Sequence, residues 1–151
     1  MKCPSCENLM TQNDMDGVVL DVCTEFCGGI WFDAGEFQRF DEAHEAAPMD
    51  ILRPIRNAKV AVDRNKTRPC PRCEDTTLQK RFVDDAHELQ IDQCVKCSGI
   101  FLDPGELETL RDENRGEVER KRVIEDFYSR ATPSDEKSNK GLKAVLKLLF
   151  K

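Results

Sequence analysis

Eight cysteines, grouped in four close pairs, constrain this chain of 151 residues more than any other feature. Sixteen residues separate the first two pairs, and twenty residues separate the last two. Paired thiolates at such spacings turn their sulfurs toward one ion, so each set of four predicts a tetrahedral metal site. The predicted ligands are Cys3, Cys6, Cys23 and Cys27 in the first set, and Cys70, Cys73, Cys94 and Cys97 in the second.

Zinc is the ion that these sets favour, one ion in each, because a redox-silent ion suits four thiolates. Iron in a rubredoxin-like site is the main chemical rival, and disulfide bonds are a third alternative. The N-terminus has no apolar secretory segment, which predicts a cytoplasmic protein whose thiols stay reduced. No apolar run approaches the ~20 residues of a membrane span.

A site closed by four protein ligands has no open coordination position, so the metal is expected to stabilise the fold and not to catalyse a reaction. Thiol-redox chemistry is the alternative, because residues 3–6 and 70–73 both have the pattern Cys-Pro-x-Cys. Such redox motifs normally follow a strand at the start of a helix, and neither repeat meets that condition. Metal ligation is therefore favoured, and we expect no enzymatic activity.

Each set of cysteines is expected to enclose a short β-hairpin. In the first repeat, alternating apolar residues and a turn signal predict strands over residues 9–13 and 18–23. In the second repeat, the same reasoning predicts strands over residues 77–83 and 88–94. The hairpin would deliver the second pair of cysteines to a place beside the first pair.

A helix is expected after each hairpin, because Asp33 and Glu36, like Asp103 and Glu106, have the spacing of a capping box. The first helix would end near residue 46, before Pro48, and the second would be longer. Acid–base catalysis by these four carboxylates is the alternative interpretation. It is disfavoured because no histidine or nucleophile accompanies them.

Two aromatic residues and two histidines complete the set of candidates. Trp31 and Phe101 hold matching positions, and we expect them to be core anchors packed on the metal sites, with exposed recognition residues as the alternative. His44 and His87 differ in position between the repeats, which argues against a role as ligands.

Charge is distributed in blocks, although the net charge of the chain is only −6. The net charges are −8 for residues 1–47, +4 for residues 48–69, −5 for residues 70–130 and +3 for residues 131–151. Acidic repeats disfavour nucleic acid as a partner, because phosphate neutralisation needs basic residues. The basic segment 48–69 is expected to pair with the repeats or to be solvated, and Val60 and Val62 predict a short strand within it.

The C-terminal residues 140–151 predict a short amphipathic helix with lysines on one face and apolar residues on the other. It is too short to span a bilayer. Docking on its own chain and binding of another protein are equally favoured. Weak contact with an anionic membrane surface ranks behind them.

The two copies of Cys-Pro-x-Cys, followed by the tracts 23–37 and 94–107 with their shared Gly-Ile and Asp-x-Gly-Glu, carry a specific resemblance. The chain resembles the bacterial zinc-ribbon family that is likened to the zinc finger of transcription factor IIB. The resemblance covers residues 3–40 and 70–110, and it implies a zinc ribbon with four cysteine ligands in each copy. The three residues between Cys23 and Cys27 depart from the family's usual spacing of two.

These observations predict a small metal-stabilised α+β fold, in which two zinc ribbons are each followed by a helix and a C-terminal helix ends the chain. The expected parts are residues 1–47, 48–69, 70–130 and 131–151. The expected function is that of a non-enzymatic tandem zinc-ribbon protein that binds another protein, with a link to transcription. A nucleic-acid-binding transcription regulator and a thiol-redox or iron-binding protein are the alternatives.

Overall fold

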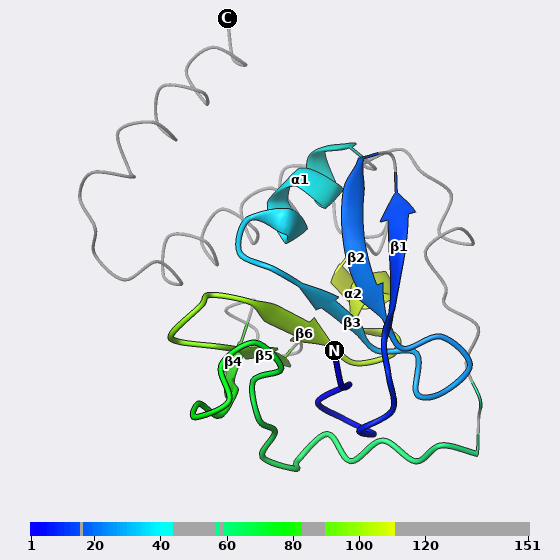
Figure 1. The fold of residues 1–151 in the computed structure, drawn as a ribbon, viewed down its shortest axis with the longest axis vertical. Coiled ribbons are helices and arrows are strands. Elements are labelled where there is room, and N and C mark those ends of the chain that lie inside the picture. Colours follow the sequence, from blue (N-terminus) through cyan, green and yellow to red (C-terminus); the bar gives the residue numbers. More distant parts are fainter. Residues whose placement is uncertain (16, 44–56, 58, 83–89, 111–151) are drawn as a thin grey trace, which may run out of the picture.

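The computed structural model describes residues 1–15, 17–43, 57, 59–82 and 90–110, and these contain one unit twice (Figure 1). The first copy runs β1 (Thr11–Met15), β2 (Val18–Val22), β3 (Ile30–Phe32) and α1 (Glu36–Ala43). The second copy runs β4 (Gln79–Phe82), β5 (Gln90–Gln93), β6 (Ile100–Leu102) and α2 (Glu106–Leu110). Each copy therefore has three strands and then a helix. The domain boundaries expected from the sequence stay a prediction.

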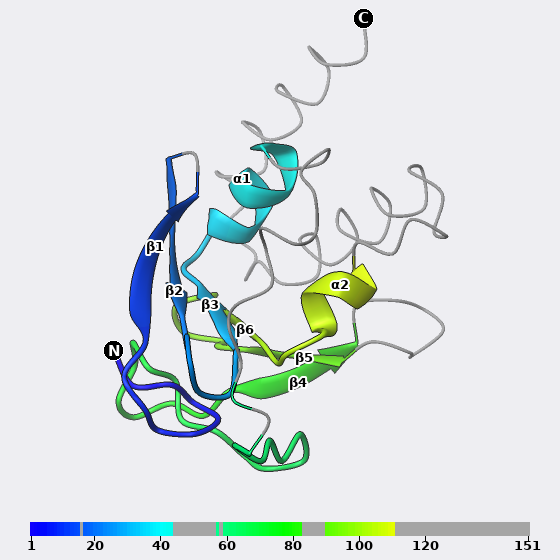
Figure 2. The same ribbon diagram turned by 90° about the vertical axis from the view of Figure 1, so that its right-hand side faces the viewer.

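The two copies form a single antiparallel sheet of six strands, in the order β1-β2-β3-β6-β5-β4. They meet where β3 pairs with β6, side by side at the centre of the sheet (Figures 1 and 2). The register places Ile30 opposite Leu102, Trp31 opposite Phe101 and Phe32 opposite Ile100. Because Trp31 and Phe101 are equivalent residues and the flanking pairs are exchanged, the junction has approximate two-fold symmetry.

The two hairpins overlap the strand ranges expected from the sequence, and the hairpin turn at residue 17 has the expected cause. Gly17 has a φ of +88°, which favours glycine, and its N–H donates to Asp14 Oδ1 at 2.8 Å. The sequence does not predict β3 and β6. These strands have three residues each and are buried on both faces, so they show no alternation of polar and apolar residues.

The expected strand at Val60 and Val62 is wrong, because the structure has a turn and loop over residues 59–67. Both valines are partly buried and pack instead against a buried cluster that contains cysteines and aromatic residues, which explains why they are apolar. The expected continuation of the helices beyond residues 43 and 110, and the C-terminal helix over residues 140–151, lie outside the described residues.

Apolar side chains on one face of the sheet pack under the helices. Phe32 is central, with its ring centroid 5.1 Å from that of Phe37 and 5.6 Å from that of Phe40. The other members of this core come from both copies: Val18, Leu20, Val22, Ile30, Ile91, Ile100, Leu102 and Leu107. Since β3 and β6 are adjacent, the two copies share this core.

A second buried cluster, which we call the cysteine cluster, comprises Cys3, Met10, Cys23, Cys27, Trp31, Cys70, Leu78, Cys94 and Phe101. It contains cysteines of both quartets together with the aromatic pair of the β3–β6 junction. Trp31 and Phe101 have no exposed surface, so the prediction that they are core anchors is confirmed.

The turn before each helix combines a glycine with a returning glutamate. Gly35 and Gly105 have φ angles of +79° and +91°, conformations that L side chains rarely adopt. Glu36 Oε2 accepts a hydrogen bond from Asp33 N–H at 2.8 Å, and Glu106 accepts the same bond from Asp103 at 2.8 Å. The returning half of the expected capping box is therefore present in both copies. The aspartate carboxylates instead contact arginines.

Candidate metal centres

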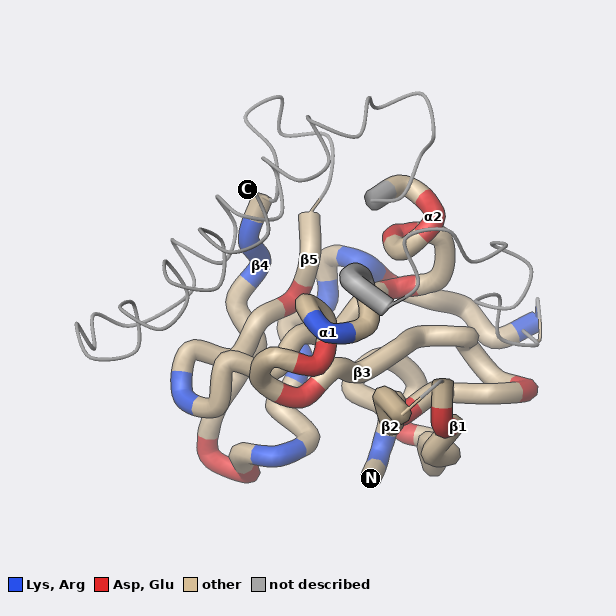
Figure 3. Tube along the Cα trace, turned by 90° about the horizontal axis from the view of Figure 1, so that it is seen from above, with Lys and Arg blue, Asp and Glu red and all other residues tan. Residues whose placement is uncertain are grey.

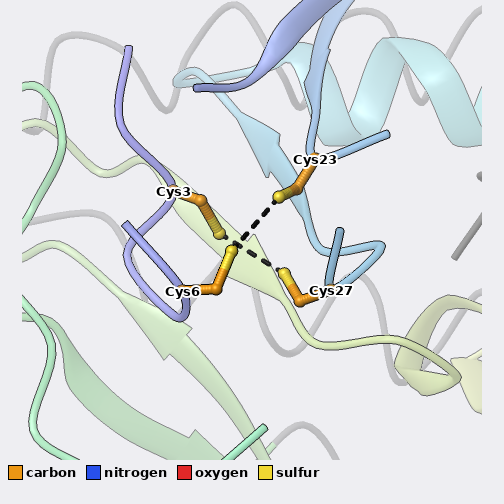
Figure 4. Close-up of side chains that lie close together, drawn as sticks. All are labelled: Cys3, Cys6, Cys23 and Cys27. Atoms are coloured by element: carbon orange, nitrogen blue, oxygen red, sulfur yellow. Dashed lines mark hydrogen bonds between the residues drawn. The ribbon is translucent and has the colours of Figure 1, made fainter. Parts of the chain in front are cut away.

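The first quartet gathers sulfurs from two segments that the sheet brings together (Figure 4). Cys3 and Cys6 lie in the N-terminal turn, and Cys23 and Cys27 lie between β2 and β3. The Sγ atoms of Cys3 and Cys27 are 3.5 Å apart, and those of Cys6 and Cys23 are 3.4 Å apart. All four sulfurs lie within 4.8 Å of one another.

The second quartet repeats this arrangement with Cys70 and Cys73 before β4 and Cys94 and Cys97 between β5 and β6. The Sγ atoms of Cys70 and Cys97 are 3.7 Å apart, and the four sulfurs again lie within 4.8 Å of one another. Two members, Cys73 and Cys97, are partly exposed, whereas Cys6 is the only partly exposed member of the first quartet.

The same backbone hydrogen bonds close the loop between strands in both copies. Cys23 N–H donates to Gly29 and Gly28 N–H to Cys23, just as Cys94 N–H donates to Gly99 and Ser98 N–H to Cys94, at 2.9–3.0 Å. The additional residue between Cys23 and Cys27 is absorbed inside this closed loop, where Glu25 has a φ of +67°. The wider spacing therefore leaves the quartet intact.

Hydrogen-bond donors point at the sulfurs. The N–H groups of Gly29, Cys73 and Cys97 approach the Sγ atoms of Cys27, Cys70 and Cys94 at 3.4, 3.3 and 3.5 Å. Asn8 Nδ2 approaches Cys6 Sγ at 3.4 Å. Such donors favour the charged thiolate, which is the form that binds a metal.

The sulfurs of the first quartet share protons unequally. Hydrogen bonds from Cys27 and Cys3 lower the pKa of Cys23 to about 4, although burial opposes the shift. Hydrogen bonds to Cys23 and Cys27, together with burial, raise the pKa of Cys3. In the second quartet, burial raises the pKa of Cys97. A metal ion replaces the remaining protons, so its binding releases protons and strengthens as the pH rises.

Each quartet fits one zinc ion. Four thiolates about 2.3 Å from a central ion in a tetrahedron have sulfurs about 3.8 Å apart, close to the separations found here. All eight cysteines are free thiols, so the structure has no disulfide among them. Zinc bound to four thiolates keeps no position for water or substrate, so it supplies folding energy and no Lewis acid chemistry.

A family model described as "Transcription factor zinc-finger" matches residues 2–42 and 69–113, more than half of the chain. The chain belongs to this zinc-ribbon family. The two matched segments coincide with the two copies of the unit, so the expectation of a tandem zinc-ribbon protein is confirmed. Searches of curated proteins and of solved structures gave no match.

A buried arginine accompanies the second quartet of this zinc-ribbon protein. Arg68 is fully buried, and its guanidinium lies 2.6 Å from Asp92 and 3.0 Å from Asp103. It also donates to the carbonyl of Asp63 at 2.9 Å and lies over the ring of Phe101, 5.3 Å from the centroid. Burial raises the pKa of Asp103, although the arginine partly offsets the shift.

A second arginine connects the two copies. Arg72 lies between Cys70 and Cys73, and its Nε donates to Asp33 Oδ1 of the first copy at 2.8 Å. Its Nη2 is 3.4 Å from Asp21 Oδ2. Burial alone would raise the pKa of Asp33, but hydrogen bonds from Arg72 and from Trp31 hold it below its ordinary value.

Sequence reasoning missed both arginines as partners of these aspartates. The expectation that the basic segment pairs with the repeats holds for Arg68, but the specific pairing needs the tertiary structure. The aspartates of the Asp-x-Gly-Glu motif thus contact arginines, and the expectation that they have no catalytic role stays a prediction. His44 and His87 lie outside the described residues.

Proposed function

We propose that this zinc-ribbon protein is a non-enzymatic protein-interaction module with a role linked to transcription. Two zinc-binding quartets and the family are the established part of this conclusion. The observation that carries the proposal further is that carboxylates contact most of the basic residues of the described part of the chain.

Most of the lysines and arginines in the described part of the chain contact carboxylates. The pairs are Lys66 with Glu7 at 3.6 Å, Lys80 with Asp92 at 3.0 Å, Lys96 with Asp75 at 3.0 Å, and the contacts of Arg68 and Arg72 given above. Figure 3 shows the basic and acidic residues interspersed along the described chain. Paired cations attract phosphate weakly, so this arrangement supports a protein partner over a nucleic acid.

Exposed apolar side chains stand beside the cysteines. Leu9 follows the first turn and is 70% exposed, Phe26 precedes Cys27 and is 37% exposed, and Val95 follows Cys94 and is 43% exposed. The rigid metal sites hold these three side chains, which we call the tip residues. Apolar and aromatic groups on a fixed frame lose little entropy on binding, as a protein contact requires.

The non-enzymatic part of the proposal rests on the closed coordination of the quartets and on the contacts of the motif carboxylates. The cytoplasmic location stays a prediction. In the described residues, no helix has the length and apolar character needed to cross a membrane.

Quantitative crosslinking of the full chain in cells tests the proposal, with the combined variant Leu9→Ser, Phe26→Ser and Val95→Ser. We expect the variant to lose its crosslinked proteins while it keeps two zinc ions, because the changes leave the sulfurs in place. Val19→Ser is the matched control, since Val19 is 42% exposed but lies on a strand. Equal loss in both variants would argue against the tip residues.

The alternatives predict different results. A nucleic-acid-binding protein would bind duplex DNA with an affinity that falls steeply as salt rises. An iron or thiol-redox protein would be coloured, or would carry oxidisable thiols, when purified in its native state. Native mass spectrometry of the purified chain separates zinc from iron directly.

A further inference from the structure

The two metal sites meet in one buried cluster. The cysteine cluster contains Cys3, Cys23 and Cys27 of the first quartet and Cys70 and Cys94 of the second. Trp31 and Phe101 lie in the same cluster and face each other across the β3–β6 pair. When one quartet becomes ordered, its cysteines and its aromatic residue therefore pack in the same cluster as the cysteines of the other quartet.

The aromatic ring of each copy lies on the glycine that closes the metal loop of the other copy. A Cβ atom at Gly99 would overlap the ring of Trp31, and a Cβ atom at Gly29 would overlap the ring of Phe101. Gly29 accepts the loop-closing bond from Cys23, and Gly99 accepts it from Cys94. The loops that hold the second cysteine pair of each quartet are thus in contact with the opposite copy.

A charged contact adds to this packing in one direction. Arg72 is held between the ligands Cys70 and Cys73, and it donates to Asp33 at 2.8 Å. Asp33 in turn accepts from Trp31 Nε1 at 2.8 Å and begins the turn into α1. The equivalent of Arg72 in the first copy is Ser5, so only the second metal turn makes this contact.

We propose that the two sites bind zinc with positive cooperativity, because each loaded site builds the surface on which the other site is assembled. A zinc ribbon without its metal is expected to be unfolded. Zinc in one quartet orders its loop and its third strand, which then offers the opposite copy a paired strand and an aromatic contact. The coupling is reciprocal, as thermodynamic linkage requires. It concerns metal loading and does not depend on which partner the protein binds.

The test measures three zinc affinities in competition with a chelator of known affinity, with the full chain and zinc as the probe. The variant Cys70→Ser with Cys73→Ser reports the first site alone, and Cys3→Ser with Cys6→Ser reports the second site alone. Native mass spectrometry of the wild type gives the overall constant for two ions. The coupling factor is that overall constant divided by the product of the two single-site constants.

We expect a coupling factor of about ten or more, within the range that is typical of coupled sites. If a variant fails to fold even with zinc, the weakest measurable constant takes the place of its single-site constant and gives a lower bound on the factor, which supports the proposal only when that bound exceeds ten. A factor near one would overturn the proposal, since independent ribbons load independently.

A matched pair of variants assigns the contribution of Arg72. Arg72→Gln removes a cation that contacts the first copy, whereas Lys96→Gln removes a cation that contacts Asp75 inside the second copy. We expect Arg72→Gln to lower the coupling factor several-fold and Lys96→Gln to leave it unchanged. An equal decrease in both variants would attribute the effect to charge near the second site and would overturn the role of Arg72.

Discussion

The two copies hold the same pair of aspartates in different ways. Asp92 and Asp103 of the second copy contact Arg68, which is fully buried and belongs to the segment just before that copy. Asp21 and Asp33 of the first copy contact Arg72, which is 42% exposed at its side chain and belongs to the second copy. The aspartates of the second copy therefore have an arginine from their own side of the molecule, whereas those of the first copy contact an arginine of the other copy.

This difference indicates that the two copies are unequally stable, although the sheet that joins them is nearly symmetric. The shared sheet and the exchanged glycine–aromatic contacts treat both copies alike. The arginine contacts differ between the copies, and the burial of each arginine determines how much it contributes to the free energy of unfolding. A buried, hydrogen-bonded ion pair is costly to break, while a partly exposed pair contributes ~1 kcal/mol or less.

Loss of a metal site should have the largest effect and should expose the asymmetry. We expect Cys70→Ser with Cys73→Ser to unfold both copies, because the first copy then loses its strand partner and its aspartates have no buried arginine such as Arg68 to hold them. We expect Cys3→Ser with Cys6→Ser to leave the second copy folded with one zinc ion. Amide hydrogen exchange of residues 90–110 and 18–40 measures this directly, and equal protection losses in both variants would contradict it.

Removal of Arg68 should have the next largest effect. Arg68→Met leaves Asp103 buried without its guanidinium contact, and such a loss typically costs about 3–5 kcal/mol. Denaturant unfolding with saturating zinc measures the change. The double variant Arg68→Met with Asp103→Asn should recover part of the loss, because it removes the uncompensated charge. No recovery would show that packing on Phe101 is the main role of Arg68.

The pH dependence of stability offers another comparison of the two copies, through Glu36 and Glu106 in the turns before the helices. Burial raises the pKa of Glu106 to about 7, against an ordinary value of 4.5. The folded state thus binds more protons than the unfolded state between these values, and the contribution of Glu106 to stability is lost as pH rises toward 7.

Glu106→Gln should therefore match the wild type near pH 5 and exceed it by about 2–3 kcal/mol at pH 8. Glutamine mimics the neutral carboxyl and can still accept from Asp103 N–H. Denaturant unfolding at several pH values with zinc present gives the difference in the free energy of unfolding between the variant and the wild type. The pH dependence of metal binding cancels in this difference, because both proteins have the same cysteines. Glu36→Gln makes the same change in the first copy. A difference that does not vary with pH would contradict the prediction.

The spacing of the cysteines was sufficient to predict both quartets, since local turns and one hairpin determine where those sulfurs lie. Trp31 and Phe101 were predicted as anchors for a similar reason, because each follows its own metal loop closely. The capping glutamates also depend on contacts within three residues of sequence. Features that are fixed by short stretches of chain were therefore accessible without the structure.

The pairing of the two copies into one sheet could not be predicted from the sequence. β3 and β6 are 70 residues apart in the sequence, and their three-residue strands carry no periodic signal. The partners of Arg68 and Arg72 depend on that pairing or on the path of the preceding segment. Arg68 is one of several basic residues in segment 48–69, and nothing in the sequence distinguishes it as the one that is buried beside two aspartates.

The smallest expected effect comes from Arg72. Arg72→Gln should lower the free energy of unfolding by about 1 kcal/mol or less with saturating zinc, since solvent screens a half-exposed pair. Lys96→Gln, which breaks a pair with Asp75 on the surface, should change it by less. High salt should weaken the effect of Arg72→Gln, because screening acts on exposed charges. If Arg72→Gln costs as much as Arg68→Met, the first copy depends on its neighbour through that one side chain, and the shared sheet is the minor link between the copies.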